Sequence, residues 1–234
     1  VMTAATRAGG RLPIEQAVNI VALAAAGLHH AHTKTDAEGR PLNIVHRDVT
    51  PSNVLVSYEG SVKVSDFGVA KWAAQQTETQ YGTLKGKIPY MSPEQARCEA
   101  LDGRSDVFAL GILLYELVTG TRLHQGTNDY AVLTRIIHED APPPSRTRPD
   151  VPPGLDLIVA RALARDRAAR YASAEELQLA LEALARQERM NVSAVALART
   201  MQGLFGSKVA AWHRARAEGQ TLGQHILART LAEG

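Results

Sequence analysis

The chain has only one cysteine and no long apolar run, and these two features restrict the class of protein to which it can belong. Cys98 has no partner for an internal disulfide, so a reducing compartment is expected. The longest apolar stretches, around residues 20–28 and 107–118, are shorter than the roughly 20 residues that a membrane-spanning helix needs. The first residues also lack the apolar region of a signal peptide. We therefore expect a cytoplasmic protein with no membrane segment in this chain.

A strong net charge is missing as well. The chain carries 26 Lys and Arg against 24 Asp and Glu, which gives a formal net charge of +2. This value is too small to indicate nucleic acid or a membrane surface as a partner. With 234 residues, of which 45% are hydrophobic, the chain has the length and composition of one large domain or of a domain with an appendage.

Helices dominate the predicted secondary structure. Residues 13–33 place apolar side chains at three- and four-residue steps, which predicts an amphipathic helix. Residues 106–120 are apolar nearly all round, which predicts a buried central helix ending near Gly120. Further helices are expected at 128–139, about 155–165 and 174–188, and then a tail of two or three helices broken at Gly203, Gly206 and Gly219.

The segment NIVHRDVTPSNVLVSYEGSVKVSDFGVAK, residues 43–71, departs from this helical pattern. Two short apolar runs, Val54–Val56 and Val62–Val64, flank a turn at residues 58–60 and predict a β-hairpin. A short strand is also expected at the beginning of this segment, and a long exposed loop over residues 69–92.

Polar side chains stand at both ends of the predicted hairpin. Asp48 and Asn53 precede it and Asp66 follows it. An amide oxygen and a carboxylate brought together across a hairpin form a hard-oxygen site of the type that Mg²⁺ prefers. A second carboxylate without metal could orient a hydroxyl nucleophile and take its proton. The segment therefore indicates phosphoryl transfer.

These motifs resemble those of the protein kinase family, most closely the bacterial Ser/Thr kinases of eukaryotic type. HRDVTPSN resembles the kinase catalytic loop, and the DFG that begins at Asp66 resembles the metal-binding motif. Ser92-Pro93-Glu94 resembles the A-P-E motif, SDVFALGILLYELVTG the central helix of the large lobe, and Arg170 the late arginine of the family. The resemblance covers residues 1–188 and implies a mainly α fold with a small β-hairpin, the large C-terminal lobe of a kinase. Residues 189–234 would form a helical tail.

The resemblance also implies roles for single residues at the site. Asp48 would be the catalytic base, Asn53 and Asp66 would hold Mg²⁺, and Leu55 would lie under the adenine ring of ATP. Thr83 stands where many kinases carry an activating phosphothreonine.

Further residues would have supporting roles by the same resemblance. Arg47 would receive the phosphate of the activation loop. The remaining residues would be structural: His46 and Phe67 would stack, Glu94 would pair with Arg170, and Asp106 would hold the backbone of the His46-Arg47 turn.

One position departs from the family pattern. Most such kinases carry a lysine two residues after the catalytic aspartate, where this chain has Thr50, and a threonine where it has Lys87. One interpretation is an exchange, in which the Lys87 ammonium supplies the usual charge and the Thr50 hydroxyl binds it. The other is that Lys87 is a solvated loop charge and Thr50 marks a loss of function.

Parts of a complete kinase are not found. The chain has no G-x-G-x-x-G loop and no V-A-I-K-like strand ahead of the catalytic loop, so the small N-terminal lobe is expected upstream, in a longer protein, or is missing from a true half-protein. The favoured hypothesis is a protein kinase fragment, inactive alone, whose substrate is a protein. Ser/Thr is favoured over Tyr because the loop keeps Pro51 and lacks an Ala-Ala-Arg run. The alternative is a non-catalytic, pseudokinase-like binding module.

Overall fold

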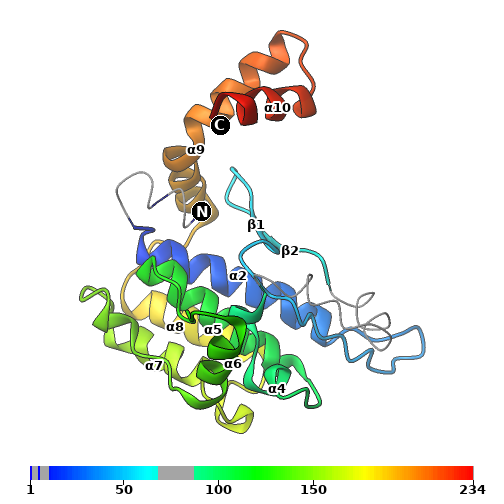
Figure 1. Cartoon of the computed structure of the whole chain (residues 1–234), viewed down its shortest axis with the longest axis vertical. Coiled ribbons are helices and arrows are strands. Elements are labelled where there is room, and N and C mark those ends of the chain that lie inside the picture. The colour runs from blue at the N-terminus through cyan, green and yellow to red at the C-terminus, as the bar shows by residue number, and fades with distance from the viewer. Residues whose placement is uncertain (2–4, 6–10, 68–86, 234) are drawn as a thin grey trace.

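Helices are the main element of the described part of the molecule, and its sheet has two short strands (Figure 1). The structure is a computed structural model and describes residues 1, 5, 11–67 and 87–233. The helices are α2 (Ile14–His32), α4 (Pro93–Ala96), α5 (Gly103–Thr119), α6 (Asp129–His138), α7 (Pro153–Ala162), α8 (Ala174–Gln187), α9 (Ala194–Ala217) and α10 (Leu222–Glu233). The strands are β1 (Val54–Val56) and β2 (Val62–Val64), and short 3₁₀ turns are η1 (Ile88–Tyr90), η2 (Pro144–Arg146) and η3 (Arg167–Ala169). Among the described residues, no helix has the length and apolar character needed to cross a membrane.

Helix α5 is the axis of the fold, as its apolar sequence predicts. Every residue from Ser105 to Thr119 is buried, and α2, α7 and α8 pack around it. Gly120 adopts φ +74°, a left-handed conformation that glycine reaches without strain, and it ends the helix. The predicted helices around α6, α7 and α8 are also confirmed.

Three details of the sequence-based prediction are wrong. The end of the exposed loop expected over residues 69–92 forms the turn η1, in which Ile88 and Tyr90 are buried, and residues 69–86 lie outside the described residues. Helix α9 runs unbroken through Gly203 and Gly206, since the side chains before them, Leu197 and Met201, are buried in the core and fix the helix. An internal glycine costs about 1 kcal/mol relative to alanine, which packing of this kind outweighs. The strand expected near residue 43 is not formed: Asn43 has φ +49°, which is incompatible with an extended strand.

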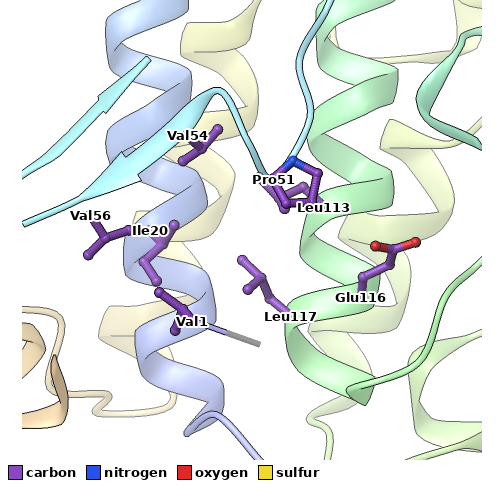
Figure 2. Close-up of a pocket in the computed structure, with 8 residues that line it drawn as sticks. All are labelled: Val1, Ile20, Pro51, Val54, Val56, Leu113, Glu116 and Leu117. Carbon is purple, nitrogen blue, oxygen red and sulfur yellow. The ribbon is translucent and has the colours of Figure 1, made fainter. Parts of the chain in front are cut away.

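The β-hairpin lies across α2 and has one face on the core. Its strands are antiparallel, with Val54 opposite Val64 and Leu55 opposite Lys63. Successive side chains of a strand point to opposite faces, so Val54 and Val56 line an apolar hollow of about 60 Å³ between α2 and α5 (Figure 2). Leu55 points the other way and is 52% exposed.

The Asp106 carboxylate joins α5 to the loop before the hairpin. Its Oδ2 accepts hydrogen bonds from His46 N at 2.8 Å and from His32 Nε2 at 2.8 Å, and its Oδ1 accepts one from Arg47 N at 2.9 Å. Asp106 is only 1% exposed. A buried charge is tolerated when it is fully hydrogen-bonded, and here three donors satisfy it.

A second buried carboxylate, Glu94, fixes the segment that contains α4. Arg170 donates from Nη1 and Nη2 to its two oxygens at 2.7 and 2.8 Å, and Ser105 Oγ donates at 2.7 Å. Burial alone would raise the pKa of Glu94, but the hydrogen bonds from Arg170 and Ser105 outweigh it and lower the pKa to about 2. The pair is therefore ionised in the folded protein at neutral pH.

Removing the Asp106 carboxylate should destabilise the fold. We expect Asp106→Ala to lower the free energy of unfolding by about 3 kcal/mol or more, since two buried backbone donors each lose a partner worth about 1–3 kcal/mol. Urea unfolding followed by circular dichroism measures this. The control is Asp140→Ala, whose side chain is 80% exposed and pairs with Arg165, and which should cost less than about 1 kcal/mol. Equal losses in the two variants would contradict the anchoring role.

The Glu94 pair should make stability depend on acidity. The pKa of Glu94 is lower in the folded protein than in the unfolded chain. The contribution of the pair to the free energy of unfolding is therefore complete above about pH 4.5 and is lost as the pH falls toward 2. The advantage of the wild type over Glu94→Gln in unfolding free energy should therefore shrink by up to about 3 kcal/mol between pH 6 and pH 2.5. Glu175→Gln, at a side chain that is 57% exposed, is the control and should show no such trend. A pH-independent difference for Glu94→Gln would refute the assignment.

Candidate active site

The loop of residues 46–53 is shaped by its anchors rather than by regular secondary structure. Arg47 has φ +66°, and Asp66, beyond the hairpin, has φ +59°. Residues other than glycine are strained in this left-handed backbone conformation, and such strain persists only where surrounding contacts enforce it. For Arg47 the enforcing contacts are its N–H to Asp106 and its carbonyl, which accepts from Gln95 Nε2 at 2.9 Å.

Asp48 and Lys87 meet at the centre of the site. Lys87 Nζ lies 2.5 Å from Asp48 Oδ2, although the two residues are 39 positions apart. The side chains are 33% and 13% exposed, so the pair is reachable from solvent but partly desolvated. Thr50 is buried, and its carbonyl accepts from Asn53 N at 3.0 Å. Among the described residues, no hydrogen bond joins the Thr50 hydroxyl to Lys87.

Asn53 and Asp66 supply the oxygen atoms expected of a cation site. Asn53 Nδ2 donates to the Asp48 carbonyl at 2.7 Å, which fixes the amide and directs its Oδ1 away from that bond. The backbone carbonyl of Asn53 accepts from Ser65 N at 2.9 Å, so the residue next to Asp66 is tied to Asn53. The Asp66 side chain is exposed. One amide oxygen and one carboxylate suit Mg²⁺, which commonly takes one or two protein oxygens and leaves its other positions to water and phosphate.

A contact between the His46 and Phe67 rings supports the backbone at the end of the hairpin. The His46 and Phe67 rings lie 4.5 Å apart between centroids. His46 Nε2 donates to the Ser65 carbonyl at 2.9 Å, and because a carbonyl only accepts, Nδ1 is left to accept from Asp48 N at 3.3 Å. His46 is fully buried and links the two ends of the hairpin.

The proposed regulatory residues are only partly described. Arg47 lies at the site with its backbone held as above. Thr83 lies outside the described residues. The structure therefore places one member of this expected pair.

Sequence reasoning missed a buried polar pair beside the site. Tyr90 OH donates to Glu116 Oε2 at 2.7 Å, and Leu123 N donates to Glu116 Oε1 at 3.2 Å. Burial raises the pKa of both groups, and the neighbouring Glu116 carboxylate raises that of Tyr90 further. Arg122 lies over the Tyr90 ring at 5.7 Å. The available signal was a glutamate inside an otherwise apolar helix, a position that requires a partner.

Comparisons with known proteins identify the family of the chain. Residues 2–181 match the family model described as protein kinase domain. The chain is 41% identical over 197 residues to the tyrosine-protein kinase MasK of Myxococcus xanthus, covering 84% of this chain and 30% of MasK. It is 40% identical over 171 residues to the serine/threonine-protein kinase PknB of Mycolicibacterium smegmatis, covering 72% of this chain and 26% of PknB. It is 33% identical over 184 residues to the serine/threonine-protein kinase PrkC of Bacillus subtilis, covering 79% of this chain and 27% of PrkC.

A solved structure shows the same architecture. The kinase domain of Mycobacterium tuberculosis PknI superposes with a TM-score of 0.55 at 28% identity. The match covers 77% of this chain and 59% of that one. The chain thus spans between about a quarter and a third of the length of the curated relatives named above.

The family match covers well over half of the chain and includes the loop, the hairpin and both buried anchors. The chain belongs to the protein kinase family, within the eukaryotic-type Ser/Thr kinases of bacteria.

Proposed function

We propose that this chain is the large lobe of a kinase that transfers the γ-phosphoryl group of ATP to a serine or threonine hydroxyl of a protein substrate. The single observation that carries the proposal is the contact between Asp48 and Lys87, on a loop whose Asn53 amide is bonded to the Asp48 backbone. A carboxylate and an ammonium at this spacing can handle a proton and a developing negative charge together.

Asp48 is the proposed base. The substrate hydroxyl would lie against the Asp48 carboxylate and give it its proton while the hydroxyl oxygen bonds to the γ-phosphorus. The bond from that phosphorus to the bridging oxygen breaks in the same displacement, and ADP leaves with the electron pair. The partly buried position of Asp48 keeps bulk water from competing with the hydroxyl.

Asn53 and Asp66 are the proposed Mg²⁺ ligands, and Leu55 the floor of the adenine site. ATP and Mg²⁺ are the general cofactors of the family, and the ion neutralises phosphate charge when bound. The half-exposed Leu55 offers adenine an apolar face, since its neighbours in β1 turn toward the core. His46 and Phe67 hold the end of the hairpin from behind.

Lys87 is the proposed second catalytic residue. Its ammonium already lies at the Asp48 carboxylate, which favours the exchange interpretation over a solvated loop charge. Among the described residues, the Thr50 hydroxyl makes no hydrogen bond to the Lys87 ammonium. The exchange would therefore preserve the positive charge of the usual lysine, but not a hydrogen bond between lysine and threonine. We also infer that Arg47 binds a phosphate on Thr83 in the active state.

We further propose that activity requires a small lobe above this floor and that the kinase unit comprises residues 1–188 of this chain. The described residues would contact adenine from one side only, through Leu55, and the chain has no glycine-rich loop for the phosphates.

Phosphoryl transfer tests the proposed function. The chain joined to a kinase small lobe should transfer ³²P from ATP to serine- and threonine-containing peptides in preference to tyrosine peptides. Asp48→Asn should lower kcat by about 100-fold or more, as expected for loss of a positioned base. The chain alone should show no transfer and bind Mg²⁺·ATP no tighter than about millimolar, because most nucleotide contacts are missing. No transfer by the joined wild-type protein would favour the pseudokinase-like alternative. Full activity of Asp48→Asn would show that Asp48 is not the base, and a preference for tyrosine would overturn the proposed acceptor.

Lys87 can be tested separately in the same protein. Lys87→Ala should lower kcat by about 10-fold or more, because it removes a charge that acts in the transition state. The double exchange Thr50→Lys with Lys87→Thr should recover much of that loss. Lys34→Ala is the control, since Lys34 is exposed in the loop after α2. An unchanged kcat in Lys87→Ala would show that Lys87 is a solvated loop charge.

A further inference from the structure

One residue of the β-hairpin turn is buried, although Tyr58 and Glu59 beside it are exposed. Gly60, the last residue of the turn, is buried and has φ +83°. A Cβ atom at this position would lie 2.0 Å from the Ala194 carbonyl oxygen and 3.0 Å from Ala198 N. The backbone of the turn therefore rests directly on the first turns of α9, at Ala194 and Ala198. Glycine is required here both for its conformation and for the close approach.

A second contact lies farther along the same helix. The Tyr58 ring, in the hairpin turn, meets the Phe205 ring edge-on with centroids 6.0 Å apart. Figure 1 shows α9 rising beside the tip of the hairpin. The hairpin thus touches α9 at two points, near Ala194 and at Phe205, along the helix.

Helix α9 is itself fixed to the body of the lobe. Leu197 is fully buried and Met201 is 3% exposed, and both belong to the main hydrophobic core. Just before the helix, the Asn191 carbonyl accepts from Gln16 Nε2 of α2 at 3.1 Å. The first half of α9 therefore forms a rigid support and is not a loose appendage.

The hairpin needs such a support. Each strand has three residues, and a two-stranded hairpin alone is at best marginally stable. Helix α2 supports the strands from the core side, and α9 is the element that covers the turn. Asn53 immediately precedes β1, Leu55 is its central residue, and Asp66 lies two residues after β2. Any tilt of the hairpin therefore moves these three residues.

We propose that residues 194–205 of α9 act as a brace that positions the floor of the nucleotide site through the hairpin turn. Gly60, Tyr58 and Phe205 are its positioning residues, and none of them touches the reacting groups. The nucleotide part of this inference rests on the proposed function of Leu55, Asn53 and Asp66. The brace itself rests only on the contacts of the turn with α9.

Two glycines of this chain give a matched test of the brace. Gly60→Ala and Gly39→Ala both place alanine at a positive φ, +83° and +80°, but only Gly60 has a neighbour within 4 Å. Both variants therefore carry the same backbone strain, and their difference reports the clash with α9. Hydrogen exchange of the whole chain is the readout. Gly60→Ala should speed exchange in residues 54–64 and 194–205 by about 10-fold, as local opening does, and Gly39→Ala should leave these segments unchanged.

Phe205→Ala is the second variant, in case Gly60→Ala fails to fold. It should speed exchange in residues 54–64, and Phe205→Tyr, which keeps the ring, should not. Gly203→Ala is the control on α9, since no atom lies within 4 Å of its added Cβ. Equal exchange in Gly60→Ala and Gly39→Ala, or an unchanged hairpin in Phe205→Ala, overturns the brace.

Kinetics separate positioning from general stability. In the protein joined to a small lobe, Phe205→Ala should raise KM for ATP by about 5-fold while KM for the peptide stays within about 2-fold, because the hairpin floor carries the nucleotide contacts and not the peptide contacts. Phe205→Tyr should restore KM for ATP. A faster exchange with an unchanged KM for ATP overturns the positioning role. If the wild type transfers no phosphate at all, the proposed function fails, whereas the exchange experiment still decides whether the brace exists.

Discussion

The Asp106 carboxylate is the interaction on which the site depends. Two successive backbone amides, of His46 and Arg47, point at its two oxygens, and this holds Arg47 in a left-handed conformation. The direction of the chain at Arg47 in turn sets where Asp48 stands. A carboxylate suits this position because it accepts several hydrogen bonds at once, and burial strengthens each of them electrostatically. The third donor, His32, ties the end of α2 to the same point.

The start of α5 anchors both halves of the site. Ser105 donates to Glu94, and the next residue, Asp106, accepts from the loop that carries Asp48. The segment with Lys87 is thus held through the Glu94–Arg170 pair and the segment with Asp48 through Asp106. Because Ser105 and Asp106 are neighbours on one buried helix, the segments that carry Lys87 and Asp48 are held to the same element. A buried ion pair is a modest source of stability but a strict constraint on geometry.

The proposed nucleotide side of the site is built differently. It rests on a hairpin too short to be stable alone, supported by α2 below and by α9 at its turn. The proposed catalytic residues are therefore tied to the core by charged hydrogen bonds, and the proposed nucleotide floor by packing. Packing contacts of this kind depend on the shape of two surfaces, which explains why a single added methyl group at Gly60 has no room.

The sequence by itself determined the central helix and the hairpin, and it indicated the proposed chemistry of the site. The apolar stretch around Val107–Val118 could only be a buried helix, and the motifs containing Asp48, Asn53 and Asp66 indicated phosphoryl transfer, because helix periodicity and donor chemistry are local properties. Only the tertiary structure decided that Lys87 meets Asp48 without bonding to the Thr50 hydroxyl, that Glu116 is paired with Tyr90, and that α9 continues through Gly203 to support the hairpin. These contacts join residues far apart in the chain. Their energies come from burial and from hydrogen bonds between surfaces that meet only after folding, and no local pattern of residues records them.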